Sequence, residues 1–284
     1  MNVKVQILFF INIFLLFFVI FIFSYSREKH KLTVAFLDVG QGDAIYVEAP
    51  NGNQILIDGG PDKKVVSELG NIMPFGDKNI DVVLATHPDA DHIGGLPYVF
   101  DSYKIGSFID NGAPSDTQTS KTLQKKVEEE KSLQVKASRG MKIILDEKDN
   151  VVFSVLAPYQ DTKSLKDTNE GSIVLELSYG SSTFMFTGDA PQDVENYLVE
   201  HDGSYLKSDV LKVGHHGSRT SSSETFLKTV APEFAIISDG KNNRYGHPHK
   251  EVLDFLNKLG IKILRTDQEG MIVCESNAER VVCK

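Results

Sequence analysis

The sequence of 284 residues predicts a mixed α/β fold in which two mixed β-sheets are covered by outer helices. Apolar segments of strand length run through the whole chain, and helical patterns are interspersed in both halves. This irregular order does not favour a doubly wound parallel sheet, in which strands and helices alternate. With 41% hydrophobic and 24% charged residues and no low-complexity tract, the composition is that of a globular protein.

The first half is expected to begin with an antiparallel meander of three strands, because an Asn-Gly-Asn turn at residues 51–53 separates two apolar segments. A β-branched run at residues 80–85 then predicts a buried strand. The strands expected in this half are residues 32–38, 44–49, 54–58, 80–85, 143–145 and 151–156. The helices expected are residues 96–103 and a charged segment with a thin apolar stripe, 116–133.

The second half contains one clear hairpin, which turns through Gly180 and two serines, and then strands and helices in turn. The strands expected are residues 172–179, 183–187, 210–213, 234–238 and 261–264. The helices expected are residues 191–200, 222–230 and 250–259. Since no linker composition is found within residues 32–284, we treat this region as one domain.

Residues 1–31 differ from the rest of the chain. Residues 7–23 form an apolar run interrupted only by Asn12, which is at the short end of what spans a bilayer as a helix. The run is long for a cleaved signal peptide, and no Ala-x-Ala site follows it. We therefore expect a transmembrane signal anchor that holds the protein at the cell membrane by a single pass, with cleavage as the alternative.

Two observations bear on the side of the membrane, and they point in opposite directions. The basic residues that follow the apolar run would keep the domain in the cytoplasm. Cys274 and Cys283, however, flank a predicted terminal hairpin that would place them opposite each other, and a disulfide there would indicate an oxidising compartment. The alternative is two reduced cysteines in a cytosolic protein. We expect an extracytoplasmic domain.

The charge limits the kind of partner. The formal net charge is −9, and the first 31 residues are basic, so the remaining chain is more acidic still. A negative net charge does not favour the binding of a polyanion over a wide surface. Bound divalent cations would neutralise part of the charge.

The most informative motif is Thr-His-Pro-Asp-Ala-Asp-His-Ile-Gly-Gly at residues 86–95. It places His87, Asp89, Asp91 and His92 at the carboxyl end of the strand predicted at residues 80–85, where α/β sheets carry their chemistry. The alternative is a polar turn between a strand and a helix.

Three further polar, glycine-flanked segments end strands, and with the first motif they hold six of the eight histidines. Imidazole and carboxylate ligands suit Zn²⁺, Mn²⁺ or Fe²⁺, and no cysteine lies near them. The number of candidate ligands exceeds the need of one ion, and predicts two divalent ions bridged by a carboxylate. These segments are residues 187–189, 214–218 and 245–249.

The motifs resemble those of the metallo-β-lactamase superfamily, and more narrowly the metallo-β-lactamase-like domain of the ComEC family of competence DNA-uptake proteins. They occur in order over nearly all of residues 32–284. The resemblance implies an αββα four-layer sandwich with two metal ions at one edge. The matching segments are residues 36–43, 57–60, 86–95, 186–189, 211–218, 237–238 and 245–248.

The resemblance also implies a set of ligands. One ion would take His87, Asp89 and His215. The other would take Asp91, His92 and His247, with Asp189 as the bridge. Asp89 stands where the broad superfamily has histidine, as in the ComEC-like branch, and this oxygen-rich site shifts the expected metal towards Mn²⁺ without excluding Zn²⁺.

Neighbouring residues could orient the ligands or contact the substrate. In an extended segment His215 and His216 would point to opposite faces, so we expect only one of them, preferably His215, to be a ligand. Turn formation or helix capping is the alternative for most of the others. These candidates are Asp38, Asp43, Asp58, His216, Ser218, Asn243, Tyr245 and His249.

The expected reaction is hydrolysis by a metal-activated hydroxide, with Asp91 orienting the nucleophile or moving its proton. The ComEC resemblance implies a phosphodiesterase or nuclease that acts on DNA, although the channel spans of that family are missing. The alternatives are a cell-surface phosphodiesterase similar to phosphorylcholine esterases, a lactonase or β-lactamase, and a metal-dependent binding module without turnover. The partners expected are nucleic acid or a small phosphodiester and the membrane, and no protein partner can be inferred.

Overall fold

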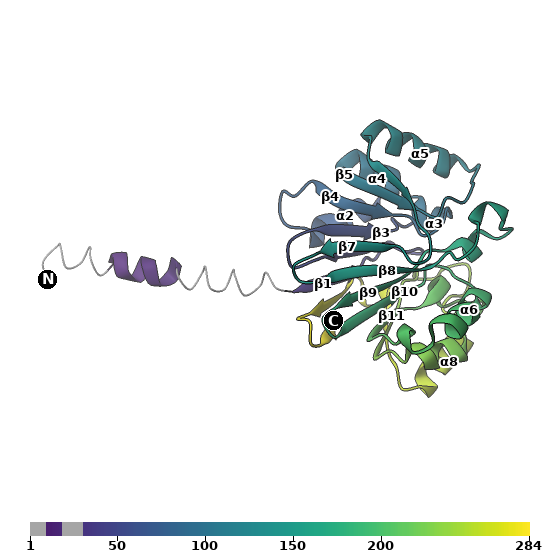
Figure 1. Ribbon diagram of the computed structural model, residues 1–284. Coiled ribbons are helices and arrows are strands. Elements are labelled where there is room, and N and C mark those ends of the chain that lie inside the picture. Colours follow the sequence, from purple (N-terminus) through teal and green to yellow (C-terminus); the bar gives the residue numbers. More distant parts are fainter. Residues whose placement is uncertain (1–9, 19–30) are drawn as a thin grey trace, which may run out of the picture.

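The computed structural model describes residues 10–18 and 31–284. Two β-sheets lie face to face, and helices cover the outer face of each sheet (Figure 1). This arrangement confirms the two-sheet, helix-covered α/β fold predicted from the sequence, and its layers follow the order α-β-β-α.

The first sheet has eight strands in the order β15-β14-β1-β2-β3-β4-β5-β6. β1, β2 and β3 form the predicted antiparallel meander, and β3 to β6 then run parallel to one another. The strands are β1 (Leu32–Phe36), β2 (Ile45–Glu48), β3 (Gln54–Ile57), β4 (Asn79–Leu84), β5 (Lys104–Asp110), β6 (Leu133–Lys136), β14 (Ile272–Ser276) and β15 (Val281–Cys283).

The second sheet has seven strands in the order β13-β12-β11-β10-β9-β8-β7. β7 to β10 are antiparallel, whereas β10 to β13 are parallel. Each sheet therefore contains a parallel half, and the carboxyl ends of these strands carry the polar motifs. The strands are β7 (Lys142–Asp146), β8 (Val151–Ala157), β9 (Val174–Tyr179), β10 (Ser182–Phe186), β11 (Val210–Lys212), β12 (Phe234–Ile237) and β13 (Lys262–Arg265).

Helices connect the parallel strands and cover the two sheets. Apolar side chains from α2, α4 and α5 pack on the first sheet, and those from α6, α7 and α8 pack on the second. The helices are α2 (Lys64–Ile72), α3 (Ala90–Ile93), α4 (Leu96–Ser102), α5 (Gln118–Glu130), α6 (Gln192–Asp202), α7 (Glu224–Val230), α8 (Lys250–Lys258) and α9 (Thr266–Glu269), with short 3₁₀ turns η1 (Thr162–Ser164), η2 (Thr168–Gly171), η3 (Gly203–Leu206) and η4 (Gly214–Gly217).

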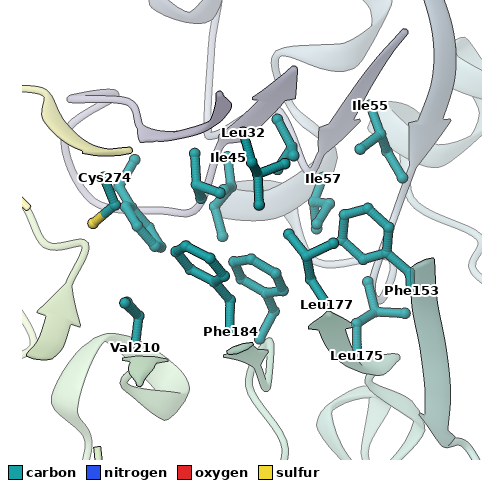
Figure 2. Packing of buried hydrophobic residues seen from close by; sticks show 14 of the residues in the cluster. Leu32, Ile45, Ile55, Ile57, Phe153, Leu175, Leu177, Phe184, Val210 and Cys274 are labelled. Carbon is teal, nitrogen blue, oxygen red and sulfur yellow. The ribbon is translucent and has the colours of Figure 1, made fainter. Parts of the chain in front are cut away.

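The main core lies between the two sheets (Figure 2). Because side chains alternate across a strand, Phe36 of β1 points into this core whereas Ala35 packs towards the helices. The second sheet follows the same rule, with Phe184 and Phe186 inside and Met185 outside. Alternating apolar side chains thus fix the register of both sheets and hold the strand ends in place.

All the strands predicted from the sequence are present, with ends that differ by a few residues. The sequence reasoning missed α2, the short helices α3 and α9, and the strands β5 and β6. β6 is a four-residue edge strand, and its first residue, Leu133, was wrongly placed at the end of the helix predicted at residues 116–133. β5 contains Gly106, where a Cβ atom would lie only 2.7 Å from the carbonyl oxygen of Asp81, so its alternating pattern is interrupted.

The cysteines form a disulfide. Cys274 and Cys283 are opposite each other in the antiparallel pair of β14 and β15, as the predicted hairpin requires, and both side chains are buried. The bond ties the last strand of the first sheet to its neighbour. Of the two alternatives left open by the sequence, the structure has the bonded pair.

Removing this bond is expected to destabilise the domain. The cysteines are nine residues apart, and in the chain-entropy model closing a loop of this size stabilises a fold by about 2–3 kcal/mol. Replacing both cysteines by alanine should lower the free energy of unfolding by about that amount, measured by urea denaturation. A double variant with the unfolding midpoint of the wild type would contradict this role, and reductant should not affect the variant.

Of the predicted transmembrane anchor at residues 7–23, residues 7–9 and 19–23 lie outside the described residues. Residues 10–18 are helical. Within the part of the chain that the structure describes, no helix is long and apolar enough to cross a membrane.

Candidate metal centre

The polar motifs come together at one edge of the sandwich. The motif at residues 86–95 follows β4 and includes the short helix α3, while Asp58 follows β3 in the same sheet. The second sheet contributes Asp189 after β10 and the two adjacent histidines after β11. Since the parallel strands of both sheets end at this edge, residues distant in the sequence become neighbours there.

Asp189 lies at the centre of this group and is buried. Its Oδ1 is 3.3 Å from Nε2 of His92. Its Oδ2 is 3.5 Å from Nε2 of His215 and 3.7 Å from Nε2 of His216. Oδ2 is also 3.9 Å from Nε2 of His87. One carboxylate thus faces four imidazoles, which is the arrangement expected of a bridging ligand.

The ligand atoms of these residues gather into groups with the spacing of a metal site. Within the described part of the chain, one group is His87, His92 and Asp189, and another is Asp91, His92 and His216. The Nε2 atoms of the three histidines are buried and make no hydrogen bond of good geometry, and neither does Oδ1 of Asp189. Buried polar atoms without partners are rare in folded proteins, so these donors fit divalent cations.

One carboxylate and one hydroxyl behind the centre hold the rings of His92 and His87. Oδ2 of Asp58 is 2.7 Å from Nδ1 of His92, and Asp58 also accepts hydrogen bonds of 2.8 Å from the amide and hydroxyl of Thr86. The Thr86 hydroxyl is in turn 3.0 Å from Nδ1 of His87. Such contacts fix the ring orientation and leave Nε2 free for a metal.

The ring of His216 is held by a backbone carbonyl oxygen, and Asp43 lies between this ring and a buried lysine. Oδ1 of Asp43 is 3.3 Å from Nδ1 of His216, which also lies 2.9 Å from the carbonyl oxygen of Ser238. Oδ2 of Asp43 is 2.8 Å from Nζ of Lys212, a side chain with no exposed surface. The sequence reasoning missed Lys212, although a lysine in an otherwise apolar strand beside the paired histidines is a usable signal.

The loop at residues 40–43 is pressed against the metal motif. At Gly42, where φ is +143°, a Cβ atom would lie 2.2 Å from the carbonyl oxygen of Asp91. That same oxygen accepts a hydrogen bond from the amide of Asp43. A glycine is therefore required for Asp43 to reach its position behind His216.

The premise of an extended segment at the adjacent histidines is wrong. His215 and His216 both have positive φ, +50° and +54°, in the turn η4, so the alternation of an extended strand does not apply. Both rings face Asp189, but the side chain of His216 is only 1% exposed whereas that of His215 is 26% exposed. His216, rather than His215, groups with Asp91 and His92.

Asp89 and His247 lie at the periphery of the centre. Oδ2 of Asp89 is 3.8 Å from Nε2 of His87, and Oδ1 accepts a hydrogen bond of 2.6 Å from Thr168 of η2, a residue that sequence reasoning missed. Neither Asp89 nor His247 belongs to any of the ligand groups among the described residues. The ring of His247 is half-buried beside those of His215 and His216, at centroid distances of 5.6 and 6.4 Å.

Three other predicted neighbours form contacts within the surrounding loops. Asp38 accepts a hydrogen bond from Gly40 and pairs with Lys64, away from the histidines. Ser218 accepts hydrogen bonds from Thr220 in the loop after η4. The amide of His249 donates a hydrogen bond to the carbonyl oxygen of Gly217 at the end of η4, and Nδ1 of His249 accepts one from the amide of Arg219.

The carboxylates and histidines of the centre shift one another's pKa values. Burial opposes ionisation of Asp189, but the charge of His92 holds the pKa of Asp189 well below its usual range. Burial also disfavours a proton on His216, yet Asp189 and Asp43 raise the pKa of His216 to about 10. Burial and the neighbouring His216 lower the pKa of His247 to about 4. Cations binding at the centre would therefore displace protons from the inner histidines.

Glu195 of α6 holds the loop that follows η4. The buried carboxylate accepts hydrogen bonds from the amides of Ser222 and Ser223, and the hydroxyl of Ser222 accepts one from the amide of Gly214. Burial raises the pKa of Glu195 to about 7, although these amide hydrogen bonds oppose the change.

This raised pKa predicts a pH-dependent stability. The unfolded carboxyl titrates near 4.5, so the folded protein binds more protons between that value and pH 7. The stabilising contribution is present below pH 4.5 and is lost as the pH rises through about 7, with a slope of at most about 1.4 kcal/mol per pH unit. Glu195→Gln should remove this slope when the free energies of unfolding of the two proteins are compared from pH 5 to 8. Parallel curves would contradict the prediction.

The comparisons with known proteins agree with this geometry. The family model described as "Metallo-beta-lactamase superfamily" matches residues 37–238, which is more than half of the chain. The chain belongs to the metallo-β-lactamase superfamily. The superfamily resemblance inferred from the motifs is thereby confirmed, and the match supports a metal-dependent hydrolase.

Curated relatives place the chain near competence proteins of the superfamily. ComE operon protein 3 of Bacillus subtilis is 36% identical over 88% of this chain and 34% of the relative. Competence protein ComA of Neisseria gonorrhoeae is 31% identical over 88% of this chain and 33% of the relative. Recombination protein 2 of Haemophilus influenzae is 31% identical over 92% of this chain and 31% of the relative. The chain thus spans about a third of the length of these relatives.

Solved structures confirm the superfamily fold. The metallo hydrolase Igni18 of Ignicoccus hospitalis superposes with a TM-score of 0.53 and 14% identity, covering 89% of this chain and 98% of Igni18. CmlA, a diiron β-hydroxylase of Streptomyces venezuelae, superposes with a TM-score of 0.54 and 12% identity, covering 82% of this chain and 52% of CmlA. At such low identity these likenesses concern the fold alone.

Proposed function

We propose that this protein is a metal-dependent phosphodiesterase that cleaves DNA with two divalent ions, Zn²⁺ or Mn²⁺. The observation that carries the proposal is the position of Asp189. Its buried Oδ1 faces Nε2 of His92, and its Oδ2 faces the Nε2 atoms of three further histidines, which are His87, His215 and His216. A carboxylate so placed can be shared by two cations, and a two-cation centre suits the displacement of a phosphodiester oxygen.

The described geometry supports a revised ligand assignment. His216 replaces His247, because it groups with Asp91 and His92 while His247 does not. His215 is close to Asp189 but partly exposed, which suits a ligand or a group that faces the substrate. In the proposed centre one ion takes His87, Asp89 and Asp189, and the other takes Asp91, His92, His216 and the shared Asp189.

The protein groups around the centre have separate tasks. When bound, the ions would lower the pKa of water towards ~7 and so supply hydroxide at neutral pH. Asp91 is partly open to solvent, with 31% of its side chain exposed, and can accept the proton of the nucleophile. Asp58 holds His92, and the carbonyl oxygen of Ser238 holds His216, in the tautomer that presents Nε2 to the centre.

The ligand chemistry supports Mn²⁺ slightly over Zn²⁺. Three carboxylates and three imidazoles form the proposed set, which is richer in oxygen than a site made chiefly of histidines. The hydroxyl of Thr168 also donates a hydrogen bond to one oxygen of Asp89, and the other oxygen faces His87.

DNA is favoured as substrate by the names of two relatives, competence protein ComA and recombination protein 2. The acidic chain argues against broad contact with a polyanion, so recognition would be confined to the neighbourhood of the metals. The alternatives are a cell-surface phosphodiesterase similar to phosphorylcholine esterases, a lactonase or β-lactamase, and a binding module without turnover.

A panel of substrates separates these functions. The full chain in mild detergent, loaded with Mn²⁺ or Zn²⁺, would be assayed on single-stranded DNA, bis(p-nitrophenyl) phosphate and nitrocefin. We expect cleavage of DNA that weakens with modest added salt. Asp91→Ala should be inactive, whereas Asp116→Ala, which changes a fully exposed carboxylate, should behave as wild type. Cleavage of bis(p-nitrophenyl) phosphate without cleavage of DNA would support the cell-surface phosphodiesterase, cleavage of nitrocefin alone would support the lactamase, and cleavage of none would support the binding module.

We also propose that residues 1–31 anchor the protein in the cell membrane by a single pass, with residues 32–284 as an extracytoplasmic hydrolase domain. The disulfide between Cys274 and Cys283 supports this side, because such bonds persist in oxidising compartments. Alkylation of thiols in intact cells before and after reduction tests it. Cysteines that react without reduction would argue for the cytoplasm.

A further inference from the structure

Three stacked rings lead from the candidate metal centre to the surface. The ring of His247 lies against that of His216, with an interplanar angle of 28°, and Tyr245 stacks on His247 at a centroid distance of 5.7 Å and an angle of 24°. The series begins at a buried histidine of the centre and ends at Tyr245, which is 49% exposed. The last ring is therefore one ring removed from the centre and open to solvent.

The segment that carries Tyr245 is held in a fixed shape. The side chain of Asn243 accepts hydrogen bonds from the amides of Tyr245 and His247 and donates to the carbonyl oxygens of Gly240 and His247. The side-chain oxygen and nitrogen of Asn243 are both engaged in hydrogen bonds within the loop. We therefore assign Asn243 to holding the loop in shape and not to contacting the substrate. A ring held in place before binding loses little conformational entropy when a ligand stacks on it.

Arg244 places a positive charge beside the same ring. Its guanidinium donates a hydrogen bond of 2.8 Å to the Tyr245 hydroxyl and lies 4.9 Å from the centre of the ring. Both side chains are exposed, so their pairing adds little to the stability of the fold. His247 and Arg244 both lie against the ring, but about half of Tyr245 remains exposed. A partly exposed aromatic ring with an adjacent guanidinium is the combination that binds a base and its phosphate in single-stranded nucleic acid.

We propose that Tyr245 and Arg244 form a nucleotide subsite, in which a nucleobase next to the scissile phosphate stacks on Tyr245 and a neighbouring phosphate binds Arg244. This inference deepens the proposed DNA hydrolase and rests on it for the position of the scissile bond. It explains how an acidic protein binds a polyanion, since the contact is confined to a single side of the metal centre. Stacking tolerates every base, so the subsite would select single strands and not a sequence.

The test compares intact DNA with DNA that lacks one base. A single-stranded oligonucleotide with a defined cleavage site, with or without an abasic nucleotide beside that site, would be cleaved by wild type and Tyr245→Ala. We expect Tyr245→Ala to lower kcat/KM about tenfold on the intact strand and to have little effect on the abasic strand. Tyr245→Phe, which keeps the stacking face, should restore most of the activity. Tyr205→Ala, which removes a tyrosine that is 85% exposed, is the matched control.

A binding measurement separates this subsite from the proposed function. The Asp91→Asn protein would be titrated with an oligonucleotide containing 2-aminopurine, whose fluorescence falls on stacking. We expect quenching that Tyr245→Ala abolishes, whether or not the wild type cleaves DNA. Equal loss of kcat/KM on intact and abasic strands, or quenching unaffected by Tyr245→Ala, would overturn the subsite and leave the hydrolase standing. Failure of the wild type to cleave DNA, with the quenching intact, would overturn only the proposed reaction.

Discussion

His216→Ala is expected to lower kcat/KM on a phosphodiester by at least about a hundredfold and to remove one of two bound ions. Nε2 of His216 is buried, makes no hydrogen bond and lies 3.4 Å from Oδ2 of Asp91 and 3.7 Å from Oδ2 of Asp189. Its loss leaves the second ion with three of its four proposed protein ligands, which are Asp91, His92 and the shared Asp189. His247→Ala should keep both ions, because His247 contributes to neither group.

The matched control for this experiment is His201→Ala, which removes an exposed histidine of α6 and should change neither activity nor metal content. Metal content would be measured by elemental analysis and activity on single-stranded DNA. Two retained ions in His216→Ala, or the loss of one in His247→Ala, would restore the ligand assignment expected from the sequence.

Lys212→Met is expected to destabilise the protein by about 3–5 kcal/mol at pH 7. Lys212 is fully buried, and its ammonium lies 2.8 Å from Asp43 and 3.0 Å from the carbonyl oxygen of Val213. Although burial opposes ionisation, Lys212 holds the pKa of Asp43 below its usual range, so Asp43 is charged at pH 7. Methionine keeps the volume but removes the cation at Oδ2 of the buried Asp43, which is then left with His216 as a charged neighbour.

The measurement is guanidinium-induced unfolding of the metal-free protein, so that lost metal binding does not contribute. Adding Asp43→Leu to Lys212→Met should cost less than the sum of the single changes, because the carboxylate that lost its cation is then removed. Lys228→Met, which removes a surface ion pair with Glu224, should have little effect. A Lys212→Met protein as stable as Lys228→Met would contradict the role of the buried pair.

Much of the fold could be predicted because burial leaves a periodic pattern in the sequence. β1 and β10 bury alternate side chains between the sheets and pack the others on helices, and both were predicted. β6 could not be predicted in this way, since its side chains are largely exposed. Its partner β5 is interrupted by Gly106, which the close approach of β4 requires.

The candidate site could be predicted as a set of loops but not in its detail. His87, His92 and Asp189 follow strands in recognisable motifs, and the structure brings them together. The choice between His215 and His216 depends on the left-handed backbone conformation of both residues, which their residue types do not predict. Lys212 acquires its role only because the loop at Asp43 reaches it from the other sheet, a contact that no local pattern encodes.

The number of divalent ions bound per chain tests the central claim most directly. The full chain would be saturated with Mn²⁺ or Zn²⁺, freed of loosely held metal and analysed for metal and protein. The geometry around Asp189 predicts two ions per chain in the wild type and the loss of tight binding in Asp189→Ala. A wild-type protein that binds no ion, or an Asp189→Ala variant that still binds two, would contradict the account.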